Sequence, residues 1–98
     1  MPYARHVTLT ASTVSTFTLT DNSSGFEILN RNGLGEIYIS HDGTANPTNP
    51  TVGGNDFDVV PAATGASIQL RRASSSQNSI VVKVISAAAT AISFRSLA

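Results

Sequence analysis

Histidine side chains bind metals, and the chain has two of them, His6 and His41. Neither has a second histidine nearby at the spacing of a zinc site, and the chain contains no cysteine that could complete one. We therefore interpret His41 as a residue at the end of a strand rather than a metal ligand. We predict no cofactor.

Oxygen ligands of the kind that calcium prefers gather around one long loop. The Asp-x-Asp-x-Asp run of a calcium-binding loop is missing, and turn formation explains the same residues equally well. Calcium binding near residues 42–58 therefore stays open at this stage. The oxygen-bearing residues concerned are Asp42, Asp56, Asp58, Asn46, Asn49 and Asn55.

Two sets of residues could suggest catalysis. Ser40, His41 and Asp42 carry the groups of a catalytic triad, but neighbouring residues of a strand point to opposite faces, so adjacency does not build one. Glu27 and Glu36 could approach each other across a hairpin as a carboxylate pair, although solvated carboxylates at the rim of a small sandwich are the more ordinary reading. We conclude from the sequence that the protein is not an enzyme.

Two short apolar runs, Phe26–Leu29 and Ile37–Ile39, flank a polar connection that contains Asn32-Gly33 and Gly35. Glycine and asparagine reach positive φ at little cost, so we expect the chain to reverse into a hairpin here. Ile37 and Ile39 alternate with polar residues, which is the period of a strand with one buried face.

The same alternation recurs along the whole chain, with no helical periodicity. It predicts an all-β fold: one domain over residues 1–98, built as a single small antiparallel β-sandwich or jelly-roll-like barrel of about eight strands. The expected strands are Arg5–Thr10, Val14–Thr20, Phe26–Leu29, Ile37–Ile39, Asp56–Val60, Ser67–Arg71, Ile80–Ile85 and Ala91–Ser96. The expected core is Val7, Leu9, Phe17, Leu19, Phe26, Ile28, Ile37, Ile39, Ile68, Leu70, Val82, Val84, Ile92 and Phe94.

Three features indicate contacts with a partner. The loop from Asp42 to Asn55 is longer than ordinary connections and is stiffened by two prolines. Residues 1–5 are a candidate extended N-terminal arm with no internal partner evident. The strand Ile80–Ile85 carries apolar residues on both faces, so we expect it either to be central to a sheet or to have its second face covered by another chain. The predicted partner-binding residues are Tyr3, Arg5, His6, Asn46, Pro47, Asn49, Pro50, Val81 and Ile85.

Charge and targeting signals narrow the partners. Charged residues make up 12% of the chain and the net charge is zero, so phosphate-driven binding to nucleic acid is not expected. No signal peptide or membrane-spanning run is visible, which predicts synthesis in a cytoplasm and no membrane partner. Sparse surface charge resists self-association weakly and favours a homo-oligomer.

Several segments in this order resemble small β-rich virion proteins of tailed bacteriophages. The resemblance covers roughly residues 25–95, and residues 45–49 lengthen the loop relative to the usual form. It rests on Glu27-Ile-Leu-Asn-Arg-Asn-Gly-Leu-Gly-Glu-Ile-Tyr-Ile, Asp42-Gly-Thr, Pro50-Thr-Val-Gly-Gly-Asn-Asp, Val59-Val-Pro-Ala and Val82-Lys-Val-Ile-Ser-Ala.

The resemblance implies a structural role in the virion, as a capsid decoration (cement) protein that binds and stabilises the assembled head. Its partners would be the major capsid protein or other virion proteins, and local three-fold symmetry at capsomer junctions would favour a trimer. The alternative is a module associated with the tail tip or a fibre, which presents the long loop to a host receptor or carbohydrate. That alternative predicts exposed aromatic residues, for which Tyr3 and Tyr38 are the candidates.

Overall fold

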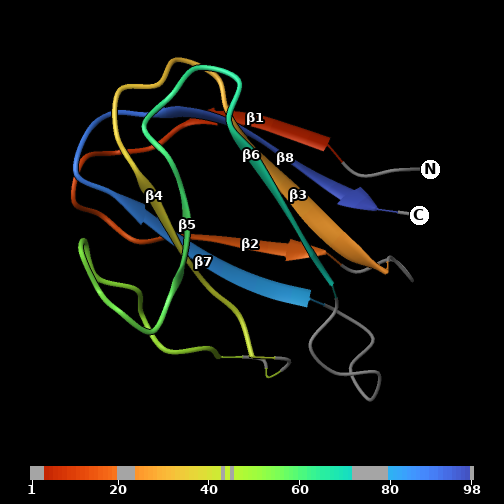
Figure 1. Cartoon of the computed structure of the whole chain (residues 1–98). Coiled ribbons are helices and arrows are strands. Elements are labelled where there is room, and N and C mark those ends of the chain that lie inside the picture. The colour runs from red at the N-terminus through yellow and green to blue at the C-terminus, as the bar shows by residue number, and fades with distance from the viewer. Residues whose placement is uncertain (1–3, 20–23, 43, 45, 72–79, 98) are drawn as a thin grey trace.

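The described residues form an all-β molecule with eight strands in two four-stranded antiparallel sheets. Figure 1 draws the computed structural model. The structure describes residues 4–19, 24–42, 44, 46–71 and 80–97. The strands are β1 (Ala4–Thr8), β2 (Ser15–Leu19), β3 (Gly25–Asn30), β4 (Ile37–Ser40), β5 (Asp58–Val60), β6 (Ser67–Arg71), β7 (Ile80–Ser86) and β8 (Ala91–Leu97). The predicted fold class is confirmed.

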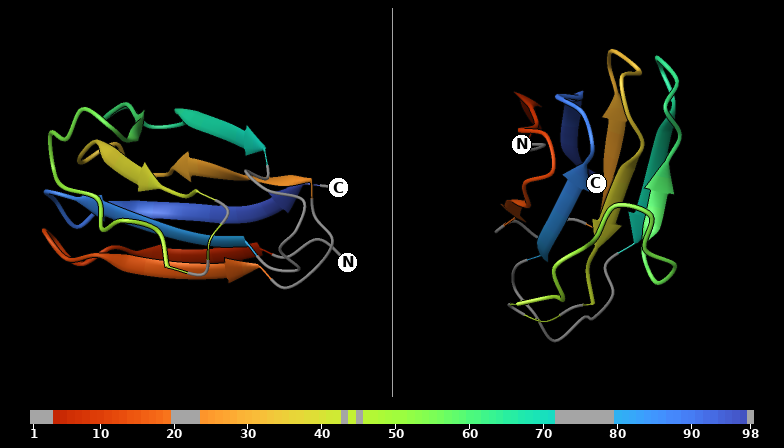
Figure 2. Two further views of the ribbon diagram at one scale, coloured as in Figure 1. Left: turned by 90° about the horizontal axis from the view of Figure 1, so that it is seen from below. Right: turned by 90° about the vertical axis from the view of Figure 1, so that its left-hand side faces the viewer.

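The strand order is that of a jelly roll. Sheet A has the order β1-β8-β3-β6 and sheet B the order β2-β7-β4-β5, so most connections cross from one sheet to the other. Both views in Figure 2 place β1 and β2 together at one side of the sandwich, and β5 and β6 at the other. Among the described strands, β4 and β5 are the one consecutive pair that are hydrogen-bonded to each other.

The predicted hairpin between Phe26–Leu29 and Ile37–Ile39 is wrong. These segments become β3 and β4, which lie in different sheets: β3 pairs with β6 and β8, while β4 pairs with β5 and β7. β3 contributes apolar side chains to the core from sheet A, and β4 contributes them from sheet B. A hairpin would have placed both runs on the same sheet, whereas the crossover lets them face each other across the core.

The core fills the space between the sheets, and alternate residues of nearly every strand enter it. Phe94 lies at its centre, stacked on Phe17 with ring centroids 4.7 Å apart and on Phe26 at 5.4 Å. The predicted core is confirmed, with Val7, Ile68 and Leu70 partly buried against it. The fully packed members are Leu9, Phe17, Leu19, Phe26, Ile28, Ile37, Ile39, Val60, Val82, Val84, Ile92 and Phe94; of these, only Val60 was not predicted.

The connection between β3 and β4 is held by a buried side chain. Asn30 Nδ2 donates to the carbonyl oxygens of Gly35 at 3.0 Å and Pro61 at 2.9 Å, and its Oδ1 accepts from the Gly33 amide at 2.8 Å. Gly33 has a positive φ of 68°, whereas Gly35 does not. Gly35 is instead a point of close approach, because an added Cβ would lie 2.7 Å from Ser86 Oγ.

The N-terminal segment belongs to the sheet. Residues 4 and 5, expected as part of an arm, begin β1, in which Arg5 pairs with Phe94 and His6 with Ser93 of β8. His6 Nδ1 also lies 2.7 Å from Ser93 Oγ. The proposed contact residue Tyr3 and the rest of the arm, residues 1–3, lie outside the described residues.

Candidate functional site

The long connection between β4 and β5 is anchored to the outer face of sheet B. Lys83 of β7 donates from Nζ to Asn46 Oδ1 at 2.7 Å and to Asn49 Oδ1 at 3.0 Å. Farther along, the backbone of Gly53 lies near the Tyr38 hydroxyl. Lys83 therefore holds the loop on both sides of Pro47.

β7 is central to sheet B, between β2 and β4, which is the first of the two alternatives for the strand with apolar residues on both faces. Ile85 pairs with Tyr38 across β7 and β4, and each of these side chains is only 8% exposed within the single chain. Pro47 and Pro50 are also buried. Neither Ile85 nor the two prolines is therefore accessible to a partner in this conformation, and Val81 is half-buried.

Tyr38 connects the loop to the start of β4. Its hydroxyl donates to Glu36 Oε1 at 3.0 Å. This hydrogen bond to a carboxylate, together with burial, raises the pKa of Tyr38 above its ordinary value. The neutral hydroxyl is the form that donates this hydrogen bond to Glu36.

The loop presents a polar surface to solvent with one large apolar side chain. Asn46, Asn49 and Thr51 are exposed, although the side-chain oxygens of the two asparagines are already used by Lys83. Val52 is 46% exposed. The sequence analysis predicted that the prolines contact a partner, but in the fold Val52 is the large apolar side chain of the loop that is exposed. In the sequence, the neighbouring Gly53-Gly54 could have indicated a tight turn at this point.

A pocket of about 260 Å³ lies at the base of the loop, at the end of β4. His41 enters this region with its ring edge-on to Phe26, at a centroid distance of 5.0 Å. Its Nδ1 atom is buried and has no hydrogen-bond partner among the described residues. Burial lowers the pKa of His41, and the nearby carboxylates of Asp58 and Asp42 oppose that shift. The pocket is lined by Ile39, Ser40, His41, Asp42, Thr48, Asp56, Phe57 and Asp58.

The carboxylates around this pocket do not assemble into a metal centre. Asp42 Oδ1 accepts hydrogen bonds from the Thr44 amide at 2.9 Å and the Thr44 hydroxyl at 2.6 Å, and these hold its pKa below the ordinary value. Asn46 and Asn49 turn toward Lys83 instead. Within the described ranges, no group of three or more histidine, aspartate or glutamate residues could hold a metal ion.

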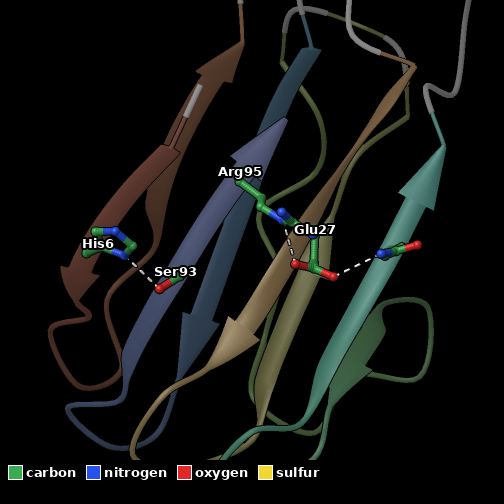
Figure 3. A network of polar contacts seen from close by, with 5 residues as sticks. His6, Glu27, Ser93 and Arg95 are labelled. Atoms are coloured by element: carbon green, nitrogen blue, oxygen red, sulfur yellow. Dashed lines mark hydrogen bonds and ion pairs between the residues drawn. The ribbon is translucent and has the colours of Figure 1, made fainter. Parts of the chain in front are cut away.

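Glu27 and Glu36 do not form a carboxylate pair, because β3 and β4 belong to opposite sheets. Glu27 lies on the outer face of sheet A, where Arg95 Nε lies 2.7 Å from Oε1 and Gln69 Nε2 donates to Oε2 at 2.9 Å (Figure 3). The Gln69 hydrogen bond and then Arg95 lower the pKa of Glu27, against the effect of burial. This cross-strand row joins β8, β3 and β6, and His6–Ser93 extends the polar contacts to β1.

Comparisons with known proteins show the fold but no family. No protein-family model matches the chain, and no curated protein matches it. Among solved structures, it is similar to a de novo designed double-stranded β-helix determined by solution NMR, with a TM-score of 0.53 and 15% sequence identity over 97% of this chain and 94% of that one. In the described part of the chain, no helix is long and apolar enough to cross a membrane.

Proposed function

We propose that this protein is a structural component of a bacteriophage virion, a capsid decoration protein that binds the assembled head and stabilises it. The resemblance of residues 25–95 to small virion proteins of tailed phages motivates the proposal. The observation that carries it to a particular surface is the loop between β4 and β5, which Lys83 holds on sheet B.

A decoration protein binds the head in many copies, and each copy contributes a small binding free energy. A loop that is already ordered before binding suits this role. Ordering a flexible loop on binding costs conformational entropy, and a loop that is already held avoids much of this cost. The anchors of this loop point inward, while Val52 and Thr51 face solvent. We infer that Val52 is the apolar centre of the contact and that the surrounding polar residues form its rim.

The low charge of the chain is compatible with such a contact. A net charge of zero avoids repulsion between decoration proteins that sit side by side on one particle. The tail-associated alternative gains no support from Tyr38, because that side chain is buried beneath the loop rather than displayed.

The test is to prepare phage heads that lack this protein and to add it back. We expect saturable binding and a raised temperature of genome release. Val52→Asp should weaken binding at least tenfold, because a charge placed in a dry contact is costly. Leu34→Asp is the matched control: Leu34 is also exposed, at 63%, but lies in the β3–β4 connection.

Three results would contradict the proposal: no binding to heads, equal weakening by both substitutions, or detection of the protein only in purified tails. The last would favour the receptor-binding alternative. Deleting residues 1–5 is a poor test because β1 begins at Ala4. Shortening 46–49 removes both acceptors of Lys83 and tests the anchoring of the loop together with its contact.

A further inference from the structure

The edges of the two sheets differ in how well they are protected against pairing with another strand. Among the described strands, β1 and β6 are the edges of sheet A, and β2 and β5 are the edges of sheet B. An edge strand has backbone N–H and C=O groups without ladder partners on one side, and proteins guard such edges with charges, prolines or short strands. β1 carries Arg5, β6 carries Arg71, and β5 is only three residues long.

β2 has none of these protections. Its five residues, Ser-Thr-Phe-Thr-Leu, include no charge and no proline. Thr16 and Thr18 are exposed on the outer face, while Phe17 and Leu19 are held in the core. Within the described residues, Thr16 to Leu19 form no backbone hydrogen bond outside their ladder with β7.

We propose that the β2 edge is a homotypic interface, at which β2 pairs antiparallel with β2 of a second copy and extends sheet B across a two-fold axis. The side chains are self-complementary in this arrangement. With Phe17 at the axis, Thr16 lies opposite the partner's Thr18, and Thr18 opposite the partner's Thr16. Threonine pairs of this kind stabilise antiparallel strands, and no charge meets its own copy.

The packing beneath the edge supports a second copy as the occupant. Phe17 is stacked on Phe94 and is 6% exposed, so the central residue of β2 is already held in strand geometry before pairing. The same pairing of β1 with itself would bring Arg5 and His6 close to their own copies. The β2 edge therefore fits a second copy without the penalty from charged residues that β1 would meet.

A charge-swap experiment tests both the interface and its register. Sedimentation equilibrium of the whole chain should show a monomer–dimer equilibrium at high micromolar concentration, as expected for a small contact. The variants Thr16→Glu/Thr18→Glu and Thr16→Lys/Thr18→Lys should each dimerise roughly tenfold more weakly, because like charges then face each other across the axis. An equimolar mixture should recover dimers, since every glutamate then faces a lysine.

Thr8→Glu, on the exposed face of β1, is the matched control and should dimerise like the parent. Thr16 lies beside Lys83 of β7, so the double lysine variant must first be shown to fold by thermal melting. If it does not fold, Thr18→Lys replaces it in the mixture. A parent that stays monomeric or forms trimers, charged variants that dimerise like the parent, or a mixture that fails to recover dimers would overturn the proposal.

Discussion

Replacing Asn30 with alanine tests whether one buried amide holds the β3–β4 connection in place. The side chain is fully buried and makes three hydrogen bonds, to Gly35, Pro61 and Gly33, at distances of 2.8 to 3.0 Å. At about 0.5–1.5 kcal/mol of net stability for each bond, Asn30→Ala should lower the free energy of unfolding by about 3 kcal/mol. For a domain of this size that corresponds to a fall in Tm on the order of 12–24 °C.

Urea unfolding followed by circular dichroism measures this loss directly. Asn32→Ala is the control, because Asn32 is exposed and accepts a single bond, from the Leu34 amide at 3.2 Å; it should change stability by less than about 0.5 kcal/mol. Asn30→Asp should cost at least as much as Asn30→Ala, since it places a buried carboxylate against two carbonyl oxygens. If Asn30→Ala unfolds at the same urea concentration as Asn32→Ala, the reasoning is refuted.

Three further predictions concern the core, the loop and the pH response. Ile39→Ala or Phe94→Ala should each cost about 2–5 kcal/mol of unfolding free energy, and unchanged melting temperatures would contradict the assigned inward faces. Lys83→Met removes both bonds to the loop asparagines and should increase proteolysis between residues 42 and 57, measured against Lys83→Arg as the conservative variant. Because burial lowers the pKa of His41, the unfolded state binds the proton more readily, so stability should be lost as the pH falls below about 6.5, the value for an unperturbed histidine. His41→Gln should flatten the melting temperature between pH 7 and 5; if this variant follows the parent, the assignment to His41 is wrong.

The strands and the core could be predicted from sequence because both follow from local alternation. Ser67–Arg71 matches β6 at both ends, and most other strands differ by one or two residues at either end. A residue such as Phe17 alternates with the exposed Thr16 and Thr18, and that pattern already indicates which side is buried. Val60 was missed because it ends a strand of three residues, too short to show a clear alternation.

The pairing of strands could not be predicted in the same way. Local patterns say that Ile28 and Ile39 are buried, but they do not say whether the two residues share a sheet or face each other across the core. The same limit hid the role of Asn30, whose partners include Pro61, far away in sequence. In sequence, a polar residue such as Asn30 at the end of an apolar run indicates the start of a turn. Its burial becomes evident only in the fold, where the β5–β6 connection packs against it.

Lys83 determines how the outer face of sheet B is covered, and its role is evident only in the fold. In sequence, Lys83 interrupts an apolar strand, and the apolar residues Val81 and Ile85 on either side of it suggest an interface with another chain. In the fold, Lys83 is the donor that brings Asn46 and Asn49 back onto that face, and Ile85 is buried without any second molecule. Burial of Ile85 within the single chain therefore removes one reason to expect a second molecule on this face. The large apolar side chain that the loop leaves exposed is Val52, at 46%.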